Sequence, residues 1–201
     1  MKVLVACEMS GRVRDAFIRK GHEAMSCDIL PSMTGGPHYQ GNVFDILEED
    51  WDLIIAHPPC TKLTVAANRW YHDKPDEVQE AAEFATVFFG YAEKVCVENP
   101  IGRLSTLFRK PDQIIQPYDF GADASKRTCL WLQQLPLLQI DPSKRKPGRL
   151  VEYPQGSGRF VERWENQTDS GQNRLGPSDD RAMLRSLTYP EIAEAMAEQW
   201  G

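Results

Sequence analysis

The chain has 201 residues, enough for one domain with a real core, and its 41% hydrophobic and 26% charged residues are typical of a soluble globular protein. No apolar run reaches the roughly 18 residues of a membrane span, and the start MKVLVACEMSGR turns polar too early for a signal peptide, so we expect a cytoplasmic protein. Five cysteines without closely spaced pairs argue against a disulfide framework, and we expect no metal site.

The net charge of −6 argues mildly against a protein that coats nucleic acid, but the charge is unevenly distributed. Residues 1–102 carry 9 Lys and Arg against 16 Asp and Glu, whereas residues 103–150 carry 9 against 4. The basic segment is where phosphates would be bound, and an ordinary solvated basic surface is the alternative interpretation.

Apolar runs of strand length alternate with helical patterns in the first half of the chain. Because these runs are continuous rather than alternating, they suit central parallel strands that helices cover on both faces. The pattern predicts an α/β fold with a doubly wound, mostly parallel sheet. The expected elements are a strand KVLVAC, a helix over about 10–21, strands EAMSCDI and WDLIIA, a helix over about 76–93, and a strand KVCVEN.

The second half of the chain is less regular. TCLWL reads as one more strand, and LVEYPQGSGRFVERW reads as two strands around a glycine turn, which predicts a hairpin. The polar segment ENQTDSGQNRLGPSDDR is expected to be a loop. The chain closes with an amphipathic helix in TYPEIAEAMAEQW, where Thr188 and Glu191 have the spacing of a capping box.

The most informative segment is DLIIAHPPCTKLT. Two consecutive prolines, Pro58 and Pro59, directly follow a buried strand, so the chain must leave the sheet there. The next residue, Cys60, therefore stands at the carboxyl end of a strand, where open α/β sheets place their ligands. This position suits a nucleophile, and an incidental loop cysteine is the alternative.

One strand later, KVCVENP has the same arrangement, because a buried strand ends in Glu98 and is followed by an amide, Asn99, and a proline, Pro100. Adjacent parallel strands end at the same edge of a sheet, so Glu98 and Cys60 are expected to lie together. A cysteine beside an acid is a known form of nucleophilic site. The alternative is that Glu98 and Asn99 merely cap the segment that follows.

These residues resemble the cytosine C5 DNA methyltransferases, especially the short forms of phages and prophages. The family's Pro-Cys-Gln-x-Phe-Ser is similar to residues 59–64, its Glu-Asn-Val to residues 98–100, and its Gln-x-Arg-x-Arg, loosely, to SKRTCLWL. The resemblance implies a Rossmann-like methyltransferase fold and an enzyme that uses S-adenosylmethionine. It further implies catalytic roles for Cys60, Glu98, Asn99 and Arg127, and substrate contacts from Pro59, Thr61, Thr64 and Lys126.

The resemblance also implies a cofactor loop after the first strand, although only Gly11 stands where the family has several glycines. Asp28 matches the acid that binds the ribose hydroxyls, and Asn42 matches the acid that binds the adenine amino group, with Asp45 as a second candidate acceptor or a simple turn residue. The implied cofactor contacts are Glu8, Ser10, Gly11, Asp28, Asn42, Asp45 and Pro58.

The implied reaction begins when the Cys60 thiolate adds to carbon 6 of cytosine, after which carbon 5 takes the methyl group. A helix amino terminus or Arg127 would favour the thiolate, Glu98 would neutralise ring nitrogen N3, and Asn99 would orient Glu98 or the base. The segment TKLTVAANRWYHDKPD mixes cations and aromatic residues and either closes over a flipped base or is an ordinary surface loop. His57 is assigned no catalytic role.

We expect a single catalytic domain over residues 1–201, in which a small basic hairpin at about 139–175 stands in place of the family's target-recognition domain. DNA would then be bound with low specificity or with a specificity partner, or the substrate would be a free deoxycytidine nucleotide. Other open alternatives are transfer of a non-methyl group from a modified donor, transfer to the amino group of a base, and a catalytically weak binding or regulatory module.

Overall fold

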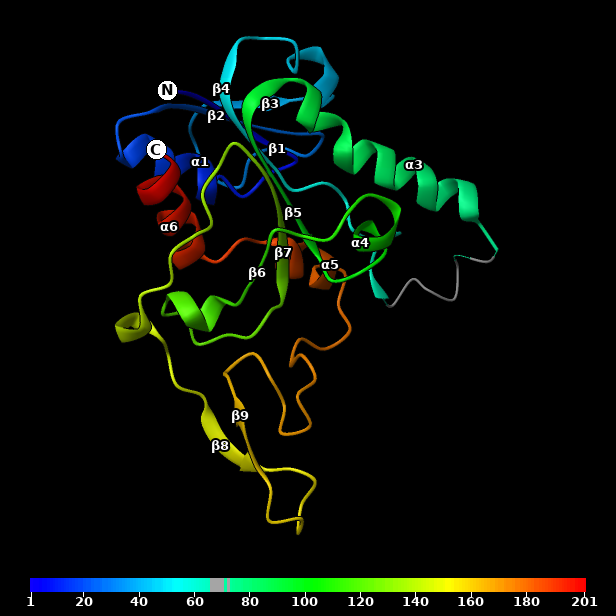
Figure 1. Ribbon diagram of the computed structural model, residues 1–201, viewed down its shortest axis with the longest axis vertical. Helices are drawn as coiled ribbons and strands as arrows, with labels where there is room; N and C mark the ends of the chain where they lie inside the picture. Colours follow the sequence, from blue (N-terminus) through cyan, green and yellow to red (C-terminus); the bar gives the residue numbers. More distant parts are fainter. Residues whose placement is uncertain (66–70, 72) are drawn as a thin grey trace.

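A seven-stranded sheet forms the centre of the protein in the computed structural model, which describes residues 1–65, 71 and 73–201 (Figure 1). The strands lie in the order β3-β2-β1-β4-β5-β7-β6; all neighbours from β3 to β5 pair in parallel, and β7 runs antiparallel to both β5 and β6. The predicted α/β, mostly parallel sheet is confirmed. The strands are β1 (Lys2–Ala6), β2 (Glu23–Asp28), β3 (His38–Gln40), β4 (Trp51–Ala56), β5 (Ala92–Pro100), β6 (Gln113–Ile115) and β7 (Thr128–Gln133).

Helices cover both faces of the sheet, which explains why the central strands are apolar throughout. In β1, Val3 and Val5 belong to the core beneath α1 (Arg12–Arg19) and α6 (Pro190–Trp200), whereas Leu4 and Ala6 belong to the core on the face of α3 (Pro75–Thr86). Successive side chains of a strand point to opposite faces, so a strand buried on both sides needs an uninterrupted apolar run. Figure 1 shows α3 on one side of the sheet and α1 with α6 on the other.

Three element boundaries differ from the expected ones. The helix expected to reach residue 93 ends at Thr86, continues as the 3-10 turn η3 (Val87–Gly90), and gives way to β5 because Ala92 already pairs with Trp51. β5 begins at Ala92, two residues before the expected strand KVCVEN, and runs one residue beyond it to Pro100, because it keeps pairing with β7. The capping box is also wrong, since the N-cap residue of α6 is Tyr189 and no side chain caps this helix.

Short elements connect the strands outside the central sheet. They are the 3-10 turns η1 (Val43–Asp45), η4 (Pro117–Phe120) and η5 (Pro142–Lys144) and the helices α4 (Leu104–Leu107) and α5 (Arg181–Ser186). Among the described residues, no helix has the length and apolar character to cross a membrane, and all five cysteines are free thiols.

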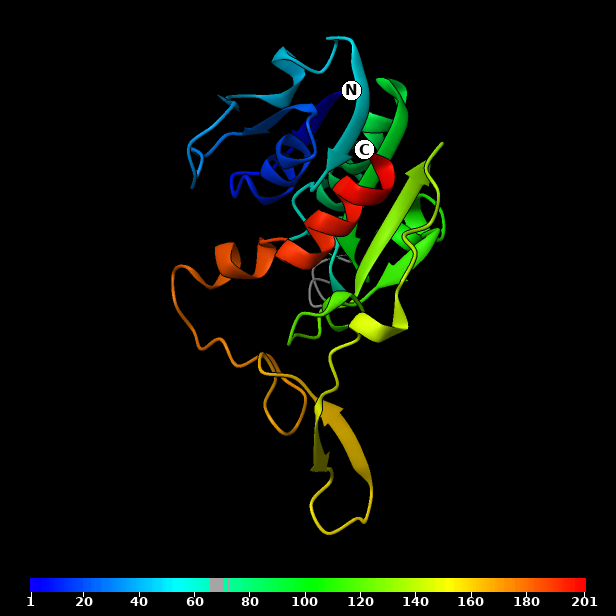
Figure 2. The ribbon, with the colours of Figure 1, turned by 90° about the vertical axis from the view of Figure 1, so that its left-hand side faces the viewer.

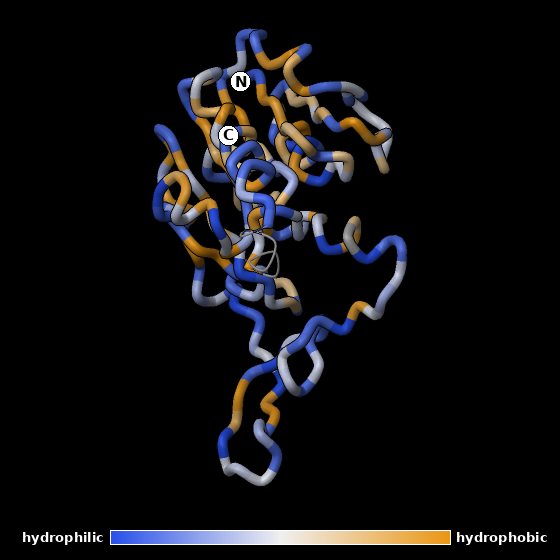
Figure 3. Tube along the Cα trace, turned by 90° about the vertical axis from the view of Figure 1, so that its right-hand side faces the viewer, coloured by the Kyte–Doolittle hydropathy of each residue, from blue (hydrophilic) through white to orange (hydrophobic). Residues whose placement is uncertain are grey.

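The expected hairpin is present as β8 (Arg149–Glu152) and β9 (Phe160–Arg163), which form a two-stranded sheet of their own. We call residues 149–163 the hairpin finger, because they project from the end of the body toward which the carboxyl ends of β4 and β5 point (Figures 1 and 2). At its base the ring of Trp164 stacks on Tyr118, with centroids 3.9 Å apart. Figure 3 shows hydrophobic segments on the finger as well as in the body.

Candidate active site

Two adjacent parallel strands bring the main candidate residues to one edge. Ala56 at the end of β4 pairs with Val97 of β5, so His57 lies level with Glu98. The chain then leaves the sheet at the two prolines and reaches Cys60, whose carbonyl accepts hydrogen bonds from the backbone N–H groups of Leu63 and Thr64. These bonds form a tight turn that keeps Cys60 at the carboxyl edge.

The Glu98 carboxylate is buried among positive and hydrogen-bonding groups. His57 Nδ1 lies 2.6 Å from Glu98 Oε2, and both side chains are about nine-tenths buried. Burial alone would raise the pKa of Glu98, but the charge of Lys126, the hydrogen bond and charge of His57, and the Thr128 hydroxyl together lower it to about 2. Glu98 is therefore an ionised carboxylate at neutral pH.

Cys60 is half-buried and close enough to Glu98 for the two to interact electrostatically. Burial and the negative charge of Glu98 raise the pKa of the Cys60 thiol, and Lys126 and Arg185 offset only part of that effect. The thiol is thus protonated at neutral pH. The thiolate expected from a helix amino terminus or from Arg127 is not what this arrangement favours.

Asn99 points to the opposite face of β5 from Glu98, as strand alternation requires. It is buried, and its Nδ2 donates a hydrogen bond of 3.0 Å to the carbonyl of Pro58. Asn99 therefore positions the backbone that carries Cys60, and it does not orient Glu98 as expected.

Lys126, and not the expected Arg127, is the basic residue of this stretch that lies near Glu98. Arg127 is exposed, and its charge acts on Tyr118 at the base of the finger. Lys126 is half-buried, influences both Glu98 and Cys60, and its Nζ lies 3.4 Å from the Leu187 carbonyl. Lys126 thus takes the place expected of Arg127, because in this stretch it is the half-buried side chain whose charge acts on Glu98.

The residues expected to follow Cys60 are only partly placed. Pro59 and Thr61 are exposed, and Thr64 is half-buried and forms a bridge with Gly102. Lys62 forms an ion pair with Glu77 at the start of α3. The hypothesis that this segment closes over a base rests largely on residues 66–70 and 72, which lie outside the described residues.

The expected cofactor loop is occupied by the protein's own groups. Glu8 is buried, and its carboxylate accepts hydrogen bonds from the N–H of Val13, at 2.8 Å, and from Ser10 Oγ, so it caps the start of α1. Gly11 has a φ of 72°, and a Cβ there would lie 2.3 Å from Arg14 Nη2. Glu8, Ser10 and Gly11 thus serve the helix start, which corrects the expectation that they face a cofactor.

Three other expected cofactor residues lie beyond β1, away from Cys60. Asp28 ends β2, is half-buried, and accepts a hydrogen bond from the Leu30 N–H at 2.9 Å. Asn42 is exposed and accepts from the Phe44 N–H, and the exposed Asp45 accepts from the Tyr39 hydroxyl. Pro58, by contrast, is buried beside the active edge.

A small hollow lies beside Glu98. It is lined by Lys126, Thr128, Thr188 and Tyr189, and by Ile192 and Met196 of α6. Asp28, the expected ribose contact, ends β2, and two strands, β1 and β4, separate β2 from β5. The site around Glu98 and the region around Asp28 are therefore neighbouring parts of one edge rather than one pocket.

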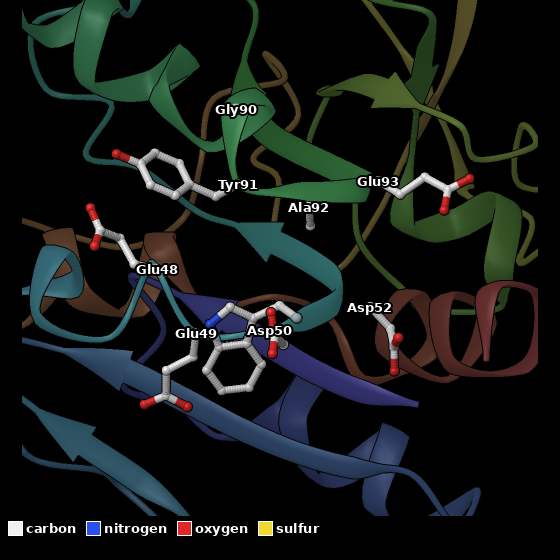
Figure 4. A pocket seen from close by; sticks show the side chains of 9 residues that line it. Glu48, Glu49, Asp50, Asp52, Gly90, Tyr91, Ala92 and Glu93 are labelled. Atoms are coloured by element: carbon white, nitrogen blue, oxygen red, sulfur yellow. The ribbon is translucent and has the colours of Figure 1, made fainter.

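A wider hollow lies at the opposite, amino edge of the sheet, between the starts of β4 and β5 (Figure 4). Its carboxylates spread around the rim rather than converging on one point, and among the described residues no group of three or more His, Cys, Asp or Glu could hold a metal ion. Because ligands of open α/β sheets bind at the carboxyl ends of the strands, we place the candidate site at the Glu98 edge. The acidic members of the hollow are Glu48, Glu49, Asp50, Asp52 and Glu93.

The sequence reasoning missed His57, Thr128 and Arg185 as members of this site. His57 had a detectable signal, since a residue directly after one parallel strand lies level with the corresponding residue of the next strand. Arg185 lies in a short helix within a polar stretch and has no such signal. The chain matches no protein-family model and no curated protein.

Proposed function

We propose that the protein is an S-adenosylmethionine-dependent methyltransferase that acts on carbon 5 of cytosine, with DNA as the substrate, Cys60 as the nucleophile and Glu98 as its proton partner. The observation that carries the proposal is the placement of Cys60 and Glu98 together at the carboxyl ends of adjacent parallel strands, with Lys126 beside both. A carboxylate beside a thiol supports nucleophilic attack when it acts as the general base for the thiol proton.

The ionisation states suggest how the covalent step proceeds. Cys60 is a thiol and Glu98 is a carboxylate, so Glu98 accepts the Cys60 proton as the sulfur adds to carbon 6. Glu98 then donates that proton to ring nitrogen N3, which neutralises the negative charge that addition creates. In this sequence no thiolate has to exist before the base binds, and Lys126 stabilises the negative charge while it moves.

The region around the end of β1 supports the proposed cofactor in part. The strand order reverses between β1 and β4, and doubly wound sheets bind their ligands at such a point. Asp28 and Pro58 flank it and would contact the bound molecule, whereas the Glu8–Gly11 loop does not fit, since its carboxylate caps α1. When bound, S-adenosylmethionine supplies the electrophilic methyl group.

The test is covalent trapping with a fluorinated substrate. Addition to carbon 6 is normally reversed when carbon 5 loses its proton to water, and fluorine at carbon 5 removes that proton. Wild-type protein with S-adenosylmethionine and an oligodeoxynucleotide that contains 5-fluorocytosine should form an adduct that survives denaturation. Cys60→Ser should reduce the adduct to background, because a hydroxyl is a far weaker nucleophile than a thiol at neutral pH.

Matched controls make the result specific. Cys27→Ala removes a buried thiol at the end of β2 and should leave trapping intact. A parallel reaction with the free 5-fluoro-deoxycytidine monophosphate separates a nucleotide substrate from DNA. Trapping by the Cys60→Ser variant would reject Cys60 as the nucleophile, and transfer to the amino group of a base would become the better hypothesis.

A further inference from the structure

His57 makes a short, direct hydrogen bond to Glu98. Its Nδ1 lies 2.6 Å from Oε2, which is the distance of a charge-assisted hydrogen bond. The backbone around it is fixed as well, since the His57 N–H donates to the Ala6 carbonyl at 2.9 Å and Pro58 follows directly. The ring therefore holds Oε2 of Glu98 from a rigid position.

The other ring nitrogen of His57, Nε2, forms no stabilising interaction with the described residues. His57 Nε2 is buried and has no hydrogen-bond partner within the described protein. A buried polar atom without a partner costs stability, and an apolar side chain would avoid that cost. Since packing does not explain a histidine here, its contact with Glu98 is the reason for it.

Several other groups face the same carboxylate, and each acts differently. Lys126 contributes charge, and Thr128 contributes a hydroxyl. Cys60 lies beside it on the loop after β4, the charge of Arg185 on α5 acts on Cys60, and Tyr189 lines the hollow at the start of α6. His57 differs from these groups because it is the residue directly after β4, the strand that pairs with β5. Its position opposite Glu98 is therefore set by the β4–β5 register.

We propose that His57 is a positioning residue for Glu98 in the reaction, a proposal that rests on the proposed function. The His57 Nδ1–H group donates a hydrogen bond to Oε2 of Glu98. This bond fixes the orientation of the carboxylate and keeps it ionised, so that its other oxygen accepts the Cys60 proton. The proton moves from sulfur to Glu98 and on to N3, while the S–C6 bond forms. His57 keeps its own proton throughout.

Two substitutions of His57 separate the hydrogen bond from the packing. His57→Asn keeps an N–H donor at the place of Nδ1, whereas His57→Leu keeps the bulk without a donor. We expect the trapping rate to stay within about threefold of wild type for Asn and to fall roughly tenfold to a hundredfold for Leu, the range expected for a hydrogen bond to a charged group. His22→Leu, at the opposite edge, should leave the rate unchanged. Equal rates for the Asn and Leu variants would overturn the proposal.

A spectroscopic signal tests the pair without relying on activity. A short N–H···O⁻ bond should give a strongly downfield ring N–H proton resonance in wild-type protein and in Cys60→Ser. Glu98→Gln should remove it, and so should His57→Leu. If the wild-type protein lacks this resonance, the His57 proposal is rejected, and the trapping experiment alone decides the role of Cys60. If the resonance is present but no adduct forms, the proposed function fails and the pair remains as a structural feature.

Discussion

The carboxyl edge of the sheet and the hairpin finger differ in burial and in the support that neighbouring strands give them. At the edge, Glu98 and His57 are about nine-tenths buried and are held by strands on both sides. On the finger, Leu150 is 71% exposed and Phe160 is 64% exposed, and β8 and β9 pair only with each other. A lone two-stranded hairpin is marginally stable, so the finger depends on its base, where Trp164 stacks on Tyr118.

The burial of the carboxyl edge suits reacting groups, whereas the exposure of the finger suits a binding surface. Reacting groups need fixed geometry, which buried strand ends supply, whereas a surface that meets a large partner needs reach and exposed cations. Residues 144–163 carry six Lys and Arg against two Glu. Among these six, Arg145 and Arg149 are paired with Glu162 and Asp169, whereas Lys144, Lys146 and Arg159 are exposed. Earlier in the basic segment, Arg109 is also engaged, with Asp112 and the Leu132 carbonyl. The basic surface for phosphates is therefore expected on and below the finger.

The largest loss of stability is expected from substitution of Arg14, a buried charge that holds the loop at the carboxyl edge. Arg14 is fully buried in α1 and donates hydrogen bonds to Ser26 and Thr34 and to the Gly35 carbonyl, which ties down the loop after β2. Arg14→Met should lower the free energy of unfolding by on the order of 3 kcal/mol, because it removes the hydrogen bonds of a fully buried guanidinium and leaves the buried Ser26 hydroxyl without this donor. Urea denaturation followed by circular dichroism measures the change.

The matched control is Arg19→Met on the same helix, where the arginine is exposed and pairs with Glu194. A surface ion pair contributes about 0–1 kcal/mol, so this variant should unfold almost like wild type. Equal losses in the two variants would mean that the loop at the edge is not held by Arg14, and the contrast with the finger would lose its basis.

An intermediate effect is expected on DNA binding. Lys146→Gln with Arg159→Gln removes two exposed charges at the base and tip of the finger and should weaken duplex binding roughly fivefold. The slope of log K against log salt should also become shallower by about 0.9 for each phosphate that the variant no longer neutralises. Fluorescence anisotropy at several salt concentrations measures both quantities.

The control for this prediction removes the same charge elsewhere. Arg19→Gln with Lys20→Gln lies at the carboxyl end of α1, at the opposite edge of the sheet from the finger. If both double variants weaken binding equally, net charge matters rather than the finger. If neither does, a free nucleotide becomes the favoured substrate.

The smallest effect is expected from the apolar side chains of the finger. Leu150→Ala should change the free energy of unfolding by less than about 0.5 kcal/mol, because the side chain is mostly in water already. Leu53→Ala, the same substitution at a fully buried position of β4, should cost about 2 to 5 kcal/mol. A similar cost for both, measured by urea denaturation, would show that the finger packs on the body in solution.

The sequence by itself determined the central strands of the sheet and the edge at which the candidate site lies, but not the short strands β3 and β6. Continuous apolar runs identified β1, β4 and β5 as strands buried on both faces, and the two prolines before Cys60 marked where the chain leaves the sheet. These features are local, since burial on both faces and the geometry of proline act on neighbouring residues. Because adjacent parallel strands end together, Cys60 and Glu98 could be expected at one edge.

Only the tertiary structure decided which side chains meet there. The β4–β5 register set His57 against Glu98, strand alternation sent Asn99 to the opposite face, and the approach to β7 turned Lys126 inward and left Arg127 exposed. Each of these outcomes depends on the pairing of segments that lie far apart in the chain. A local pattern does not contain that pairing, because it is the packing of the whole sheet that selects the register.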